Sequence, residues 1–350
     1  MADGNKYSEK LKFKTNYKSF MKHFLTTLLF LTTFFLTAQT TDNLFALTVA
    51  QDGSGDFKTI QEAINKVRDH AEMRVVITIK AGTYNEKVVI PSFKRNITLR
   101  GTDREKTIIS YDDYSGKPFR GIDVTGNEKY STYTSYTLLV QGNDCTVENL
   151  TIENTAGKVG QAVALHTEGD RVAIKNCSIL GNQDTLYLAK GGTRNYFENC
   201  FINGTTDFIF GAATAYFYNC TIESLTNSYV TAASTYQQDT YGFVFVDCKL
   251  TAKDETVNKV FLGRPWRPYA QTVFINTEMG SHIVPDGWNP WKGDKNFPDK
   301  EKTVYYAEFG SKGPGGNDVS KRVSWSYQLK KAELKKYDLN IVLNGWNPKN

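Results

Sequence analysis

The sequence predicts an all-β protein: a right-handed parallel β-helix, or solenoid, in which each turn of chain stacks on the previous one. The first observation is a four-residue motif, Asn-Cys-x-Ile or a close variant, that recurs along the chain. Its copies occupy residues 149–152, 176–179, 199–202, 219–222 and 247–250, so successive copies start 27, 23, 20 and 28 residues apart. The second observation is that Cys or Leu and then Ile alternate with polar residues in each copy, which indicates a strand with one buried face.

Units of this length are too short to hold a hairpin and a helix each. They favour one unit per coil, with equivalent positions ~4.8 Å apart in neighbouring coils. A sandwich or a barrel is the alternative architecture, but Asn-Gly hairpin signals are scarce in the middle of the chain. The Asn before each strand is expected to stack in a turn and to bond the neighbouring backbone.

Five cysteines, at positions 145, 177, 200, 220 and 248, bear on the interior of this coil. An odd number in a secreted chain indicates at least one free thiol. We expect the cysteines to stack inside the coil as small apolar fillers, in preference to forming disulfides. No Cys-x-x-Cys pair occurs, which argues against a zinc site.

The two ends of the coil have their own signals. Residues 52–70 predict a Gly turn and then a short N-terminal capping helix, with Ile60, Ala63, Ile64 and Val67 on one face. Residues 75–81 predict the first strong strand. The segment 327–346 opens with helical spacing and is expected to be a C-terminal tail packed against the outside of the stack.

Three long segments rich in Gly, Tyr, Ser or Trp interrupt the coil, and we expect them to form the walls of a groove. They are residues 111–137, 229–241 and 280–302. Two adjacent acidic residues in the first of these, Asp112 and Asp113, are expected to be solvated rather than to bind Ca²⁺.

The first 38 residues predict an N-terminal extension and a signal peptide. Lysines precede an apolar run at 24–36, and Ala38 offers a small residue for cleavage; Met21 could be the true start. The run is short for a membrane span, and a buried helix is the alternative. We therefore expect a secreted or periplasmic protein without a membrane anchor after cleavage, and one domain over residues 39–350.

Composition and charge limit the classes of binding partner. The 350 residues carry a net charge of +5, from 42 basic and 37 acidic residues, with no long Lys/Arg run. This argues against a nucleic-acid partner and favours a polyanionic substrate slightly. No Gly-x-Ser-x-Gly elbow occurs, and His166 is expected to be a satisfied or surface histidine rather than a base.

Two aspartates are the strongest candidates for chemistry. Asp184 and Asp207 each lie beside apolar residues, and they are 23 residues apart (207 − 184). A coil of that period places the two carboxyls side by side on neighbouring turns, where one takes a raised pKa and stays protonated. Arg264, in Leu-Gly-Arg-Pro-Trp, could keep the other ionised or could form only a structural ion pair. Trp266 offers a flat face for a sugar ring.

Two glutamines are expected near the same spot. Gln183 precedes Asp184, and Gln161 lies 22 residues before Gln183, one coil away. Side-chain amides can donate hydrogen bonds to a developing oxyanion without carrying charge. For Gln161 alone a turn-bridging role is the simpler interpretation, but the convergence of three coils favours a functional one.

These motifs, in this order, resemble the pectin methylesterase (pectinesterase) family over nearly all of residues 47–346. They include Asp-Gly-Ser-Gly-Asp-Phe-Lys-Thr-Ile-Gln-Glu-Ala-Ile, Gln-Ala-Val-Ala-Leu, Gln-Asp-Thr-Leu-Tyr, Asp-Phe-Ile-Phe-Gly, Leu-Gly-Arg-Pro-Trp and Tyr-Tyr-Ala-Glu-Phe. The resemblance implies a right-handed parallel β-helix, an enzyme that works without cofactor or metal, and methyl-esterified pectin as substrate. We also expect a monomer.

The resemblance also implies a role for each site residue. Asp207 is similar to the nucleophile that attacks the methyl ester of a galacturonate. Asp184 resembles the acid that protonates departing methanol and then activates water. Gln183 and Gln161 resemble the oxyanion stabilisers, and Arg264 the partner that keeps Asp207 ionised. The substrate contacts implied are Gln161, Thr132, Trp266, Tyr187 and Phe208, although the loop around Thr132 differs from the plant pattern.

Two other functions compete with this one. A lyase or polygalacturonase of the same fold is one, but the acidic Ca²⁺ cluster and the base that a lyase needs are not visible. The other is a non-catalytic, or differently specific, polysaccharide-binding β-helix. The joint presence of Gln183, Asp184, Asp207 and Arg264 argues against it.

Overall fold

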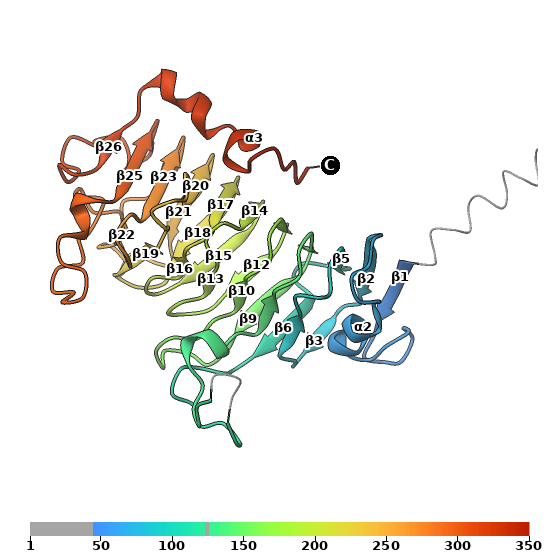
Figure 1. Ribbon diagram of the computed structural model, residues 1–350. Helices are drawn as coiled ribbons and strands as arrows, with labels where there is room; N and C mark the ends of the chain where they lie inside the picture. Colours follow the sequence, from blue (N-terminus) through green and yellow to red (C-terminus); the bar gives the residue numbers. More distant parts are fainter. Residues whose placement is uncertain (1–44, 123–125, 350) are drawn as a thin grey trace, which may run out of the picture. The chain divides into compact units, whose positions relative to one another are not determined.

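Three parallel sheets wind through the protein, as the repeat predicts. The computed structural model describes residues 45–122 and 126–349, and Leu47–Asn350 form one compact unit (Figure 1). From β2 onward, neighbouring strands in each sheet pair in parallel, and successive strands of the chain belong to different sheets. The architecture is the right-handed parallel β-helix that the sequence predicts.

Among the described residues, the first sheet has eleven strands, the second eight and the third seven. In spatial order the first consists of β1 (Ala46–Val49), β2 (Val75–Ile79), β5 (Ile97–Gly101), β8 (Thr146–Glu148), β11 (Val172–Lys175), β14 (Arg194–Glu198), β17 (Thr214–Tyr218), β20 (Phe243–Val246), β23 (Gln271–Ile275), β25 (Tyr305–Phe309) and β26 (Tyr327–Gln328). The second consists of β3 (Gly82–Tyr84), β6 (Thr107–Tyr111), β9 (Thr151–Asn154), β12 (Ser178–Leu180), β15 (Phe201–Gly204), β18 (Thr221–Ser224), β21 (Lys249–Ala252) and β24 (Glu278–Met279). The third consists of β4 (Val88–Ile90), β7 (Leu138–Val140), β10 (Leu165–Thr167), β13 (Leu186–Leu188), β16 (Ile209–Gly211), β19 (Tyr229–Ala233) and β22 (Phe261–Gly263).

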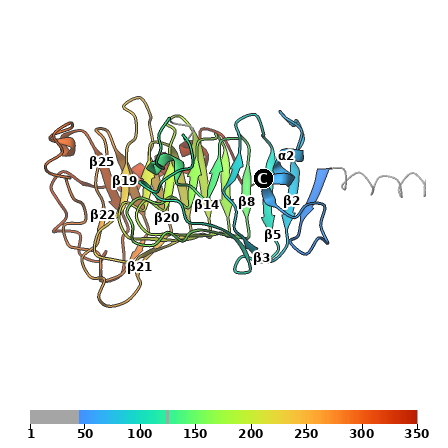
Figure 2. The ribbon, with the colours of Figure 1, turned by 90° about the horizontal axis from the view of Figure 1, so that it is seen from below.

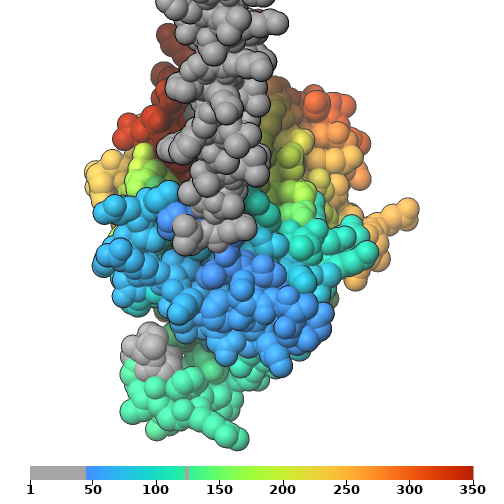
Figure 3. Space-filling view, turned by 90° about the vertical axis from the view of Figure 1, so that its right-hand side faces the viewer, coloured from blue at the N-terminus to red at the C-terminus, as the bar shows by residue number. Residues whose placement is uncertain are grey.

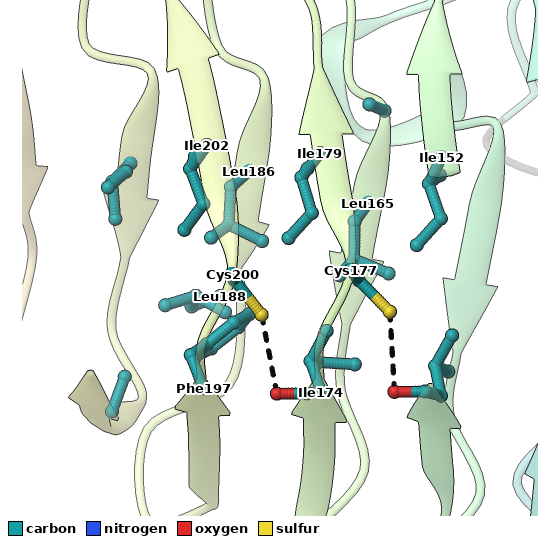
Figure 4. Packing of buried hydrophobic residues seen from close by; sticks show 14 of the residues in the cluster. Ile152, Leu165, Ile174, Cys177, Ile179, Leu186, Leu188, Phe197, Cys200 and Ile202 are labelled. Carbon is teal, nitrogen blue, oxygen red and sulfur yellow. Dashed lines mark hydrogen bonds between the residues drawn. The ribbon is translucent and has the colours of Figure 1, made fainter. Parts of the chain in front are cut away.

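The interior of the coil is a set of ladders of identical residues. Ile152, Ile179 and Ile202 are paired across β9, β12 and β15, and all three are fully buried (Figure 4). All five cysteines are buried free thiols, and Cys177, Cys200, Cys220 and Cys248 lie at equivalent positions of successive coils, which confirms the predicted ladder for these four. Cys145 lies outside it, before β8 and in line with Val172. Three of the thiols have an acceptor on the preceding coil, as the Sγ of Cys200 does 3.4 Å from the carbonyl oxygen of Ile174, whereas Cys145 and Cys220 contact a carbonyl oxygen two residues earlier.

The asparagines before the strands do stack, but the prediction that they bond the neighbouring backbone is only partly right. The Nδ2 of Asn176 donates to the Oδ1 of Asn149 at 2.8 Å, and Asn219 donates to Asn199 in the same way at 2.6 Å. At the start of that ladder Asn149 does bond backbone, the carbonyl oxygen of Gly101. All of these asparagines have a left-handed backbone, which Asn tolerates and which aligns the amides.

The predicted helix caps the N-terminal end of the stack. It is α2 (Ile60–Lys66), and its N-cap, Thr59, accepts a hydrogen bond from the backbone N–H of Glu62. The predicted apolar face is buried against the core, including Val67 just beyond the helix. Figure 3 faces this end, where the blue N-terminal residues form much of the surface. The strand predicted at 75–81 ends two residues earlier, at Ile79.

The signal peptide predicted at 1–38 lies outside the described residues. Within the part of the chain that the structure describes, no helix has the length and apolar character needed to cross a membrane.

The C-terminal tail packs outside the first sheet, as predicted. It begins with the short strand β26 rather than with a helix, and continues as the 3₁₀ helix η4 (Lys331–Tyr337) and the short α3 (Leu339–Val342). Its residues Leu329, Tyr337 and Val342 bury the outward side chains of Tyr196 and Tyr216. Figure 2 shows the strands of successive coils lying side by side in rows.

The predicted groove walls are mostly irregular, with one exception. Residues 112–122 and 126–131 project from the strands and precede the 3₁₀ helix η2 (Thr132–Thr134), and 280–302 ends in the 3₁₀ helix η3 (Lys300–Lys302) (Figure 1). The segment predicted as irregular from 229 begins instead as β19. The alternating pattern of Tyr-Val-Thr-Ala-Ala fits the third sheet, and β19 bridges β16 and β22 there.

Candidate active site

The candidate site is a groove on the outer face of the third sheet, with a cavity of about 320 Å³. Its floor comes from the turns before β10, β13 and β16, and its walls come from η2 and from the segments after β22 and β24. The lining residues are Thr132, Tyr133, Gln161, Gln183, Asp184, Asp207, Phe210, Ala232, Arg264, Trp266 and Trp291.

The two aspartates occupy the same position on adjacent coils. Leu186 pairs with Ile209, so Asp184 and Asp207, each two residues earlier, are aligned. Both have a left-handed backbone, with φ of 65° and 50°. Asp is among the few residues that tolerate this conformation, and the turn lifts each side chain out of the regular strand. The spacing of 23 residues therefore predicted their juxtaposition correctly.

Arg264 holds one of the two carboxyls. Its Nε lies 3.0 Å from Oδ1 of Asp207 and its Nη2 lies 2.7 Å from Oδ2, which is a bidentate fork. The guanidinium lies over two aromatic rings, 4.0 Å from the centroid of Tyr229 and 3.6 Å from that of Trp291. These rings fix the plane of the fork.

Both carboxyls are buried, and Arg264 makes them differ. Asp184 and Asp207 are 8% and 6% exposed. Burial, together with the neighbouring charge of Asp207, raises the pKa of Asp184 to about 8, and Arg264 opposes this from a distance. Burial also raises the pKa of Asp207, but there the direct hydrogen bonds and charge of Arg264 favour the ionised form. At neutral pH the arrangement favours a protonated Asp184 beside an ionised Asp207.

The two glutamines lie next to each other, as their spacing predicted. Gln161 and Gln183 form a bridge between coils, and the N–H of Ala162 donates to the carbonyl oxygen of Gln183 at 3.0 Å. Across the described residues, neither side-chain amide has a hydrogen-bond partner of its own. Both are half-buried and line the groove beside Asp184, so their N–H groups can meet an oxyanion there.

Of the predicted substrate contacts, Gln161, Thr132 and Trp266 line the groove, whereas Phe208 does not. Phe208 is fully buried in the central core, because the turn at Asp207 directs the next residue inward. Phe210, two residues later, faces outward from β16 and takes its place. Alternation along a strand would place residues 208 and 210 on the same face. Phe208 precedes β16, where the backbone is not yet that of a strand, so alternation alone did not predict that Phe208 and Phe210 point in opposite directions.

Tyr187 supports the groove floor from the side. Its ring stacks on Phe210 at 4.4 Å between centroids and lies 5.6 Å from that of Tyr133. It is buried and does not line the cavity that holds the aspartates, but it does border the neighbouring hollow beyond Trp266.

Residues 46–345 match the family model described as Pectinesterase. The chain belongs to the pectinesterase family. It is 36% identical over 285 residues to pectinesterase 31 of Arabidopsis thaliana, covering 80% of this chain and 86% of that protein. It is 36% identical over 316 residues to a probable pectinesterase/pectinesterase inhibitor of Brassica napus, covering 86% of this chain and 51% of that protein. The chain thus spans about half the length of several of its curated relatives.

Solved structures of the family have the same fold. The pectin methylesterase from carrot is 33% identical, with a TM-score of 0.75 over 85% of this chain and 93% of that one. A pectin methylesterase in complex with a hexasaccharide is 32% identical, also with a TM-score of 0.75, over 87% of this chain and 98% of that one. Family membership and the fold therefore agree with the resemblance that the motifs carried.

Sequence reasoning missed four groove residues of this pectinesterase-family protein: Tyr133, Phe210, Ala232 and Trp291. Tyr133 and Trp291 lie inside segments predicted to be walls, so their neighbourhood was predicted but not their orientation. Phe210 belongs to the Asp-Phe-Ile-Phe-Gly motif, and its position on β16 is the signal that could have found it. Within the described residues, no group of three or more His, Cys, Asp or Glu is arranged to hold a metal ion.

The structure also locates Asp113 and His166, for which separate predictions were made from the sequence. Asp113 is not solvated: it is 1% exposed and pairs with Lys87 at 2.7 Å and Lys117 at 3.0 Å. The loop folds back on itself, and these pairs tie it to the strands. His166 is buried beside Tyr187 and does not line the groove. Its Nε2 lies 3.2 Å from Oε1 of Glu168, but among the described residues neither ring nitrogen makes a well-aligned hydrogen bond, so the expectation of a satisfied histidine is not confirmed.

Proposed function

We propose that this protein hydrolyses the methyl esters of galacturonate units in pectin and releases methanol. One observation carries the proposal: two buried, aligned carboxyls share a groove, and only one of them is held by an arginine fork. Such a pair offers an ionised nucleophile and a protonated acid at the same pH. Membership of the pectinesterase family supports the same chemistry.

In the first step, a carboxylate oxygen of Asp207 attacks the ester carbonyl carbon of a bound galacturonate. The carbonyl electrons move onto oxygen, and the amide N–H groups of Gln183 and Gln161 stabilise that negative charge. Arg264 orients the attacking carboxylate through its two hydrogen bonds. Each well-placed oxyanion donor is worth about 10²–10³ in turnover.

In the second step, the tetrahedral intermediate collapses and the bond to the methoxy oxygen breaks. Asp184 gives its proton to that oxygen, so methanol leaves and an acid anhydride joins the substrate to Asp207. The ionised Asp184 then takes a proton from water, which attacks the substrate carbonyl of the anhydride. Asp207 leaves as a carboxylate, Asp184 is protonated again, and the product is a free galacturonate.

The groove suits a sugar chain. Trp266 and Phe210 present aromatic surface at its floor and wall, and Thr132 offers a hydroxyl opposite them. Tyr187 packs beneath Phe210 and keeps that ring in place. We also propose that the protein acts as a secreted or periplasmic monomer, without a cofactor or metal.

Incubation with highly methylated pectin tests the proposal. Methanol should appear without new reducing ends and without absorbance from an unsaturated product. New reducing ends would indicate a polygalacturonase, and unsaturated product a lyase. Binding of pectin without methanol release would indicate a non-catalytic β-helix, and each of these results overturns the proposal.

A further inference from the structure

A buried lysine in one wall of the groove is not explained by the coil. Lys300 is the first residue of η3, outside the strand ladders, yet its side chain is 0% exposed. Burying an ammonium group costs several kcal/mol unless partners compensate. A lysine retained in such a position calls for a role that an apolar residue would not fill.

The contacts of Lys300 join separate parts of the wall. Its Nζ lies 2.7 Å from Oδ2 of Asp294, in the same irregular segment. It also lies 3.4 Å from the carbonyl oxygen of Trp266, beyond β22, and 4.6 Å from the centroid of the Trp291 ring. One ammonium group therefore holds the two tryptophans that line the groove.

The backbone at Trp291 needs such support. Its φ is 55°, a left-handed conformation that is unusual and unfavourable for a bulky side chain. The N–H of Trp291 donates to the side chain of Asn289, and its ring contacts the Arg264 guanidinium at 3.6 Å. A shift of Trp291 would remove one of the two rings that fix the plane of the Arg264–Asp207 fork.

We propose that Lys300 is a positioning residue of the active site, which holds Trp291 and Trp266 so that Arg264 presents its fork to Asp207. The inference rests on the proposed function. Contact runs from Lys300 to the Trp291 ring, from that ring to Arg264, and from Arg264 to both oxygens of Asp207. Lys300 does not touch the reacting atoms.

The positive charge of Lys300 has a second consequence. The groups that act electrostatically on Asp207 are Arg264 and Lys300, which favour its ionised form, and the neighbouring Asp184 and the buried phenol of Tyr306. Lys300 in turn faces Asp294, Arg264 and Arg267. Removing Lys300 should therefore raise the pKa of Asp207 and move the acid limb of the pH profile upward.

The test uses Lys300→Met, an unbranched side chain one atom shorter that removes the charge, and Lys300→Arg, which keeps the charge. The control is Lys302→Met on the same η3, where an exposed lysine pairs with Asp299. We expect Lys300→Met to lower kcat/KM for methylated pectin about 10–100-fold, to raise KM and to shift the acid limb to higher pH. Lys300→Arg should restore part of the loss, and Lys302→Met should stay within about twofold of the parent.

Near-ultraviolet circular dichroism provides a readout that does not depend on activity. Lys300→Met should change the tryptophan bands of the folded protein, and the change should be smaller when the same substitution is made in a Trp291→Phe parent, where only Trp266 of the two held tryptophans remains. If Lys300→Met does not fold, Asp294→Asn replaces it, because that variant loosens the anchor and leaves the ammonium group in place.

A folded Lys300→Met variant with parental KM, acid limb and tryptophan bands would overturn the proposal. A lower melting temperature with these three readouts unchanged would do the same, since it indicates a merely structural lysine. Absence of methanol release by the parent would instead contradict the proposed function, and the tryptophan bands would still report on Lys300.

Discussion

Asp184 and Asp207 are nearly equivalent as pieces of backbone and very different as chemical groups. Both follow a coil of similar length, both have a left-handed φ, and both are more than nine-tenths buried. Asp207 receives two hydrogen bonds from Arg264, whereas no side-chain hydrogen bond of Asp184 is present among the described residues. The repeat therefore gives the two aspartates the same place on adjacent coils, and Arg264, which follows β22, makes their carboxyl groups chemically different.

This difference shows how a solenoid can build an asymmetric site. Adjacent coils supply the same geometry ~4.8 Å apart, which brings like groups together. Two carboxyls that close do not ionise together easily, so a single cation on one of them decides which one carries the charge. The following predictions test that asymmetry, beginning with the largest effect.

Asp207→Asn should lower kcat for methanol release by at least about 10³-fold, because the amide cannot form the covalent intermediate. The matched control is Asp247→Asn. Asp247 also has a left-handed backbone, with φ of 53°, but lies in the asparagine ladder away from the groove. That variant should retain parental activity. An active Asp207→Asn enzyme would contradict the nucleophile role.

Asp184→Asn should lower kcat by about 10²–10⁴-fold while the fold is retained, because proton transfer to methanol and from water is lost. Circular dichroism and methanol release on the same preparation measure both. Near-parental turnover would show that the acid is another group.

Arg264→Lys should lower kcat/KM about 10–100-fold, since an ammonium group supplies charge without the planar fork. Loss of the fork should also raise the pKa of Asp207, so that the acid limb of the pH profile moves upward. The exposed Lys249, which pairs with Glu278, provides a control as Lys249→Met. An unchanged acid limb in Arg264→Lys would indicate that the fork is only structural.

The basic limb of the pH profile of kcat should report the ionisation of Asp184. Its pKa is raised from an ordinary 3.8 to about 8, so the acid is protonated at neutral pH and turnover should fall as the pH passes about 8. A pH profile of kcat measures this limb. Turnover that stays constant to pH 10 would place the proton on a different group.

The smallest effect should be one of stability. A carboxyl whose pKa is higher in the folded state stabilises the fold fully at low pH, and this contribution is lost as the pH rises through about 8. Asp184→Asn should therefore melt at a higher temperature than the parent at pH 9, by about 2 °C or more, and close to it at pH 4. Equal melting temperatures at both pH values would contradict the raised pKa.

The sequence by itself determined the coil, its interior and the meeting of the aspartates. These features repeat, and a repeat records spatial adjacency: residues about one period apart become neighbours, as Asp184 and Asp207 or Cys177 and Cys200 do. The capping helix and the outer position of the tail were also readable, because both follow from local apolar patterns.

Only the tertiary structure decided what the non-repeating segments do. It buried Phe208 in the core and placed Phe210 against the groove, it paired Asp113 with two lysines, and it placed Lys300 beside the Trp291 ring. No period relates these residues to their partners, because each contact depends on how a loop folds back on the stack. The pairing of Arg264 with Asp207 lies between the two cases. Both residues were candidates from the sequence. Their contact depends on the Arg264 side chain, which extends over the ring of Tyr229 in β19 to reach Asp207.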